Sequence, residues 1–92
     1  MIIGDIDMDP VFKRILSIQS LYEVTHEGYA WCTWFSGFEN SVADVMPEGT
    51  GELRVRAAMK ILGAQGYVFG CHCGCRGDYE LTDKGLAYAL QL

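Results

Sequence analysis

The residues with the clearest chemical potential stand together in residues 71–75, which read Cys-His-Cys-Gly-Cys. Thiolates bind zinc or iron–sulfur clusters, and imidazole binds zinc. Structural zinc sites leave about two to four residues between paired cysteines, whereas here each gap is a single residue. The segment therefore leaves three alternatives open: a metal or cluster site, a redox-sensing thiol, or small residues with free thiols in a tight turn.

As a metal site, the segment would supply three thiolates and would need a fourth ligand. Neighbouring side chains of a strand point to opposite faces, so the ligands would have to come from a tight loop. As a redox site, a cysteine beside a basic side chain keeps its thiolate form and oxidises more readily. A cysteine between two tryptophans, as at residue 32, is expected to be a small core residue unless it joins the metal. The predicted ligands of zinc or an iron–sulfur cluster are Cys71, Cys73 and Cys75, with His72, Cys32 or the distant His26 as the fourth, and the basic neighbour is Arg76.

Charge is distributed unevenly along the chain. The net charge of −5 argues against a simple nucleic-acid-binding protein. Residues 1–50 contain eight acidic and two basic side chains, whereas residues 51–92 contain four acidic and five basic ones. Basic side chains attract phosphates, and arginine can also pair with guanine. Unless they are ordinary solvated surface residues, the candidates for contact with double-stranded DNA are Thr50, Arg54, Arg56, Lys60 and Arg76.

Composition and motifs exclude several classes of protein. The chain contains no Gly-rich phosphate loop, no HExxH zinc motif and no nucleophile elbow, so we expect a non-enzymatic protein. The longest run without Asp, Glu, Lys or Arg covers residues 61–75, which is shorter than the roughly 20 apolar residues of a membrane span. The first residues lack the basic start and apolar stretch of a signal peptide, so we expect a cytoplasmic protein without a membrane partner.

The elements that must position these residues begin with helices. Residues 1–8 are predicted as a loose acidic start, and residues 9–46 as the first helices. Asp9 is a suitable N-cap for a helix over residues 10–20, with Pro10 at its first position. Thr25 is a second N-cap candidate, for a helix over residues 26–36 that could instead be a strand because it is rich in aromatic residues. Residues 41–46 are predicted as a further short helix.

The second half carries stronger signals. Residues 52–65 are predicted as a helix because Val55, Ala58, Met59 and Leu62 recur on one face, and Gly66 suits its C-terminal end. Residues 67–81 are predicted as a β-hairpin that contains the cysteine-rich segment. Residues 82–92 are predicted as a last helix that begins after a threonine cap. These elements predict one domain of the α+β class, mainly α.

In this order the pieces resemble the winged helix-turn-helix superfamily over residues 41–92. The sequence SVADVM followed by ELRVRAAMKIL resembles helix two and the recognition helix, AQGYV resembles the entry into the wing, and YELTDKG resembles the return strand and final cap. The resemblance implies a winged helix with three to four helices, a β-hairpin wing and a short C-terminal helix. It also implies a dimeric transcriptional regulator, whose recognition helix over residues 52–65 enters the major groove of DNA while the wing contacts the backbone.

The acidic first half favours an alternative function on the same fold. Residues 1–50 could bind a basic protein partner, either as a protein-interaction module or as a nucleic-acid mimic of the kind that some small viral proteins provide. A homodimer could form through exposed aromatic side chains, which are enriched in interfaces, or through the leucines of the last helix. Most of the aromatic group is expected in the core; its members are Tyr29, Trp31, Trp34, Phe35 and Phe38, and the leucines are Leu86, Leu90 and Leu92.

Overall fold

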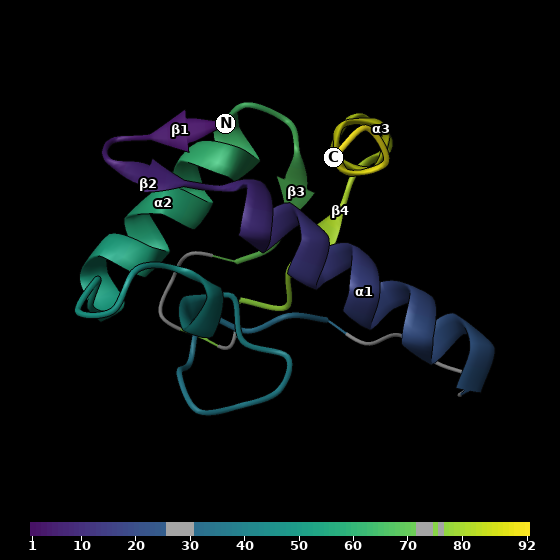
Figure 1. Ribbon diagram of the computed structural model, residues 1–92, viewed down its shortest axis with the longest axis horizontal. Helices are drawn as coiled ribbons and strands as arrows, with labels where there is room; N and C mark the ends of the chain where they lie inside the picture. The colour runs from purple at the N-terminus through teal and green to yellow at the C-terminus, as the bar shows by residue number, and fades with distance from the viewer. Residues whose placement is uncertain (26–30, 72–74, 76) are drawn as a thin grey trace.

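The protein is a small α+β fold in which helices and two short antiparallel hairpins enclose one core. The computed structural model describes residues 1–25, 31–71, 75 and 77–92. Over these residues the elements are β1 (Ile2–Ile3), β2 (Ile6–Asp7), α1 (Asp9–Thr25), the 3₁₀ helix η1 (Ala43–Val45), α2 (Glu52–Ala64), β3 (Val68–Phe69), β4 (Glu80–Leu81) and α3 (Asp83–Ala89). The hairpin β3–β4 lies between α2 on one side and α3 on the other (Figure 1). The predicted class, α+β and mainly α, is confirmed at this level.

The chain begins with an ordered hairpin, so the prediction of a loose start over residues 1–8 is wrong. β1 and β2 pair antiparallel, with Ile3 opposite Ile6, and a glycine at φ 62° lies in the turn between them. Ile3, Ile6 and Met8 are buried in the core. The alternation of apolar and acidic residues is the two-residue period of a strand, but it is too short to be distinguished from a polar tail by sequence.

A group of hydrogen bonds connects the N-terminal hairpin to α1 and α3. The Met1 amine donates hydrogen bonds to the Asp9 carboxylate at 2.7 Å and to the Tyr88 hydroxyl at 2.9 Å. The Tyr88 hydroxyl in turn donates to the same Asp9 oxygen at 2.6 Å. The amine and the hydroxyl lower the pKa of Asp9, because both stabilise the charged carboxylate. The N-terminal hairpin, α1 and α3 therefore meet at one carboxylate.

The first helix is longer than predicted. α1 begins at Asp9, one residue before the predicted start, and continues to Thr25, so Thr25 is its last residue and not the N-cap of another helix. The prediction of Asp9 as the N-cap is wrong, because the Met8 carbonyl accepts the first helical bonds, from Val11 and Phe12, and the Asp9 carboxylate instead accepts from the Met1 amine and the Tyr88 hydroxyl. No glycine or proline interrupts residues 11–25, so no local stop signal lies where the helix was predicted to end. Its inner face, formed by Val11, Phe12 and Ile15, is fully buried against α3 and β4.

The helix predicted over residues 26–36 is wrong for the part that the structure describes. Cys32 pairs antiparallel with Tyr79, and Thr33 pairs parallel with Ser41. The backbone N–H groups of Cys32 and Tyr79 each donate to the other's carbonyl, at 3.0 and 2.7 Å. Residues 26–30 lie outside the described residues. The extended form, which the aromatic content had left open, prevails because a distant strand supplies its hydrogen-bond partners.

From residue 41 onward the elements follow the predicted order. Only residues 43–45 of the short segment 41–46 are helical, as the 3₁₀ helix η1. α2 ends one residue earlier than predicted, and Gly66 follows with φ 82°. The Tyr67 N–H donates to the Leu62 carbonyl at 3.0 Å, the bond that closes a Schellman motif. In the hairpin, Val68 lies opposite Leu81.

The last helix docks through an aromatic cluster and a close backbone approach. The ring centroids of Phe12 and Tyr88 lie 4.5 Å apart, and that of Tyr67 lies 5.5 Å from Phe12. The Thr82 hydroxyl accepts a hydrogen bond from the Gly85 N–H at 3.0 Å and thereby caps α3. In the described part of the chain no helix is long and apolar enough to cross a membrane.

Gly85→Ala should destabilise the protein, although alanine normally stabilises a helix. A Cβ at residue 85 would lie 2.0 Å from the Tyr67 carbonyl oxygen, so the backbone would have to separate, and we expect a loss of about 3 kcal/mol in the free energy of unfolding. Urea unfolding followed by circular dichroism measures it. The control Ala87→Gly, at an exposed position of the same helix, should cost only about 1 kcal/mol. A Gly85→Ala variant as stable as the wild type would contradict this packing.

Candidate functional site

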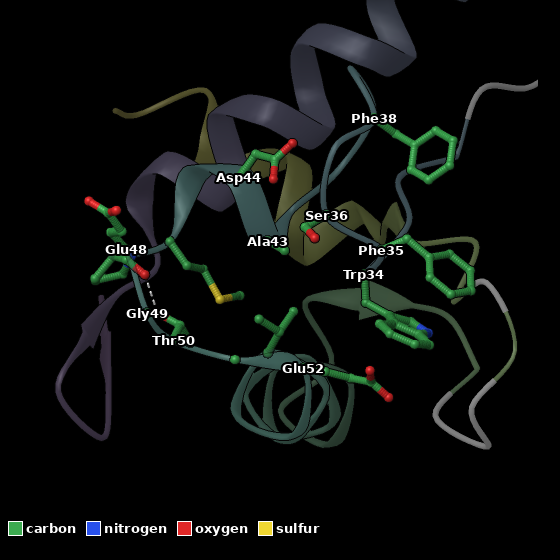
Figure 2. A pocket seen from close by; sticks show the side chains of 14 residues that line it. Trp34, Phe35, Ser36, Phe38, Ala43, Asp44, Glu48, Gly49, Thr50 and Glu52 are labelled. Atoms are coloured by element: carbon green, nitrogen blue, oxygen red, sulfur yellow. Dashed lines mark hydrogen bonds between the residues drawn. The ribbon is translucent and has the colours of Figure 1, made fainter.

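A pocket of about 700 Å³ opens where α2 begins. Its walls come from the segment after Cys32, from η1, and from the turn that leads into the first turn of α2. Figure 2 shows the rings of Trp34, Phe35 and Phe38 on one side and Glu48 on the other. Met46 and Val55, which are both buried, also line it. The pocket therefore combines apolar and aromatic surface with carboxylates.

The aromatic wall is anchored at one end and exposed at the other. Trp34 is buried, and its indole N–H donates to the backbone carbonyl of Cys75. Phe35 lies over Trp34 with ring centroids 4.1 Å apart, and Phe38 lies 6.4 Å from Phe35. Phe35 is 36% exposed and Phe38 is 57% exposed. Large apolar rings exposed beside a pocket are typical of a surface that binds a ligand or another protein.

The carboxylates around the pocket differ in their interaction partners. Both Asp44 oxygens accept the Gly37 N–H, at 3.2 and 3.0 Å, so this carboxylate holds the aromatic segment against η1. Glu52 forms an ion pair with Arg56, one helical turn later, at 3.6 Å. Glu48 is exposed in the turn before α2. Glu48 and Glu52 are thus the acidic groups that the pocket offers to a ligand.

A guanidinium of the chain itself already lies against the pocket wall. The Arg56 guanidinium lies over the Trp34 ring, 5.2 Å from its centroid, and close to the Glu52 carboxylate. The Arg56 side chain is 25% exposed. An aromatic face and a carboxylate together hold an arginine here, through a cation–π contact and an ion pair.

The structure does not gather the predicted DNA-contact residues into one open basic face. Arg54 is ion-paired with Asp5 of the β1–β2 turn, and Arg56 is held as described above. Thr50 is buried, and its hydroxyl and N–H both donate to the Pro47 carbonyl. Lys60 is exposed, and Arg76 lies outside the described residues. Their contact with DNA stays a prediction.

α2 also exposes uncharged side chains, beside the charged residues Glu52, Arg54 and Lys60. Leu53 is 77% exposed and Ile61 is 42% exposed, and two exposed alanines lie on the same helix. The C-terminal leucines named for a homodimer, Leu86, Leu90 and Leu92, are also exposed, as such an interface requires. Dimerisation itself stays a prediction.

The structure tests the proposed metal ligands only in part. Cys71 and Cys75 are exposed, while Cys73, His72 and His26 lie outside the described residues. Cys32 is 1% exposed, and burial raises the pKa of its thiol to about 12, which opposes the thiolate that a metal requires. Among residues 1–25, 31–71, 75 and 77–92, no three His, Cys, Asp or Glu side chains lie close enough to hold a metal ion. Zinc or a cluster at Cys71, Cys73 and Cys75 stays a prediction.

Comparison with protein-family models, with curated proteins and with solved structures finds no match. The pocket therefore has to be interpreted from its own chemistry. Sequence reasoning missed it because its walls come from segments that only the fold brings together. The available signals were the aromatic residues after Cys32 and the two glutamates in residues 47–52.

Alkylation should separate the cysteines by burial. In the native protein at about pH 8, where an ordinary thiol is partly ionised, iodoacetamide should modify Cys71 and Cys75, because both are exposed. Cys32 should react only after denaturation. Trypsin places Cys32 alone in residues 15–54 and the cluster in residues 61–76, so peptide mass spectrometry reads the two sites separately. Native labelling of Cys32 at the rate of the cluster would contradict its burial.

Proposed function

We propose that the protein is a non-enzymatic protein-interaction module on a winged-helix frame, and that its acidic side binds a basic protein partner. The frame is supported by the order of elements after residue 41. There η1, α2, the β3–β4 hairpin and α3 follow in the order in which the winged-helix resemblance expects helix two, the recognition helix, the wing and the closing helix. Residues 72–74 and 76, which lie between β3 and β4 in the sequence, are outside the described residues.

The observation that carries the proposal is that several basic side chains form hydrogen bonds or ion pairs within the protein itself. Arg14 donates to the Glu39 carbonyl, Arg54 pairs with Asp5, and Arg56 pairs with Glu52. The Lys84 ammonium donates to the Gln65 carbonyl at 2.7 Å. DNA binding depends on basic side chains that can neutralise phosphates. The charges of Arg54 and Arg56 are already balanced by carboxylates, and Arg14 and Lys84 each have a donor engaged by a backbone carbonyl. Glu48 and Glu52 instead line a pocket with exposed aromatic walls.

Transcriptional regulation through duplex DNA is the second candidate. α2 presents Lys60 to solvent, and the ion pair between Arg54 and Asp5 is exposed on both sides. Such a pair contributes little to stability, so a phosphate could replace the carboxylate at small cost. In that case α2 would enter the major groove with the hairpin beside it.

An anisotropy experiment distinguishes the two candidates. A labelled peptide rich in lysine and arginine should bind at about 50 mM salt and weaken at about 200 mM, whereas a labelled random DNA duplex should not bind at either concentration. The double variant Arg54→Ala/Lys60→Ala should bind the peptide at least as tightly as the wild type, because it removes positive charge. Duplex binding by the wild type that this variant loses would overturn the proposal in favour of DNA.

A further inference from the structure

We propose that the pocket at the start of α2 receives an arginine side chain of the basic partner. Its guanidinium stacks on the exposed rings of Phe35 and Phe38 and pairs with the carboxylate of Glu52, while Glu48 adds negative charge on the opposite side of the pocket. This inference rests on the proposed function and names the chemistry of the group that the same surface recognises.

The aromatic wall supplies the apolar half of such a site. Phe38 exposes 57% of its surface and Phe35 36%, and both rings line the pocket. A guanidinium within about 6 Å of a ring centroid is attracted by the negative face of the ring. The methylene groups of an arginine can also cover apolar surface such as that of Met46, which lines the same pocket.

The carboxylates supply the charged half. Asp44 is occupied by the Gly37 N–H, whereas Glu52 lies 3.6 Å from Arg56, beyond hydrogen-bond distance, and its side chain is 60% exposed. A carboxylate can accept about four hydrogen bonds, so Glu52 has capacity for a second guanidinium. Glu48 lies on the opposite side of the pocket, with its carboxylate directed away from Glu52 (Figure 2). A basic ligand would complement this charge.

The contacts of Arg56 show how this wall can bind a guanidinium. The chain already holds one guanidinium between an aromatic face, that of Trp34 at 5.2 Å, and the carboxylate of Glu52. The partner's arginine would use the same two chemical groups on the neighbouring part of the wall. Arginine fits better than lysine because its guanidinium is planar, is less strongly hydrated and stacks on rings. A volume of about 700 Å³ also leaves room for residues that flank the arginine.

Charge-matched peptides test this inference. The probe is a labelled lysine-rich peptide with one central arginine, compared with the same peptide carrying lysine, or the uncharged isostere citrulline, at that position. Anisotropy should give about fivefold tighter binding for the arginine peptide than for the lysine peptide, and the citrulline peptide should be weakest. In ¹H–¹⁵N spectra the indole N–H of Trp34 should shift on binding. That of Trp31, which donates to Glu80 at 3.3 Å and does not line the pocket, is the internal reference.

Matched variants locate the site. Phe38→Ala should abolish the preference for arginine over lysine, whereas Phe69→Ala, which removes an equally exposed ring on β3, should keep it. The double variant Glu48→Gln/Glu52→Gln should weaken the arginine peptide about tenfold. The control Glu39→Gln/Asp83→Asn removes the same charge from exposed positions outside the pocket and should weaken it about twofold at most. Thermal melts verify that each variant is folded.

The outcomes separate this inference from the proposed function. If all basic peptides bind with equal affinity and the Trp34 signal does not move, the arginine site is wrong but the protein-interaction module stands. If no basic peptide binds even at low salt, both are wrong. A Phe38→Ala variant that keeps the full preference for arginine would also overturn the site, because the ring could not then be the recognising surface.

Discussion

The arrangement of the molecule depends on one antiparallel pairing, between Cys32 and Tyr79. Each backbone N–H donates to the other's carbonyl, at 3.0 and 2.7 Å, and both side chains are buried. The pairing adds the segment after α1 to the edge of the β3–β4 hairpin and brings Trp34 to the carbonyl of Cys75. The parallel bridge from Thr33 to Ser41 then turns the chain back toward η1. Together with the Asp44 contact to the Gly37 N–H, this pairing positions the aromatic wall of the pocket.

The same arrangement places basic side chains of this acidic protein beside its own carboxylates. Arg54 reaches Asp5 of the N-terminal hairpin, 49 residues away in sequence, and Arg56 lies between Trp34 and Glu52. Exposed pairs of this kind contribute little to stability. Their effect is on the external field: they neutralise the basic residues locally and leave the net charge of −5 to act on approaching molecules. Such a field accelerates association with basic partners and repels nucleic acid.

Prediction from sequence succeeded where the signals are local. The apolar residues of α2 recur at helical spacing, Gly66 adopts the positive φ expected after the helix, and Thr82 caps α3. It failed where an element is too short to show a period, and where hydrogen-bond partners come from afar. The strands β1 and β2 are two residues each, too short for a periodic signal. The segment at Cys32 is extended because Tyr79 is its partner, and no pattern within residues 26–36 specifies that partner.

By itself the sequence determined the α+β class, the positions of α2, the β3–β4 hairpin and α3, and an acidic surplus in the first half. These properties follow from spacing, capping and composition, which act over a few residues. Only the tertiary structure decided which charged side chains stay available to a binding partner. It placed Arg54 on Asp5 and buried Thr50, and it opened a pocket between Phe38, Glu48 and Glu52. The physical reason is that a side chain's partners are set by distance in space, and the pairing of Cys32 with Tyr79 brings together residues that are about half of the chain apart.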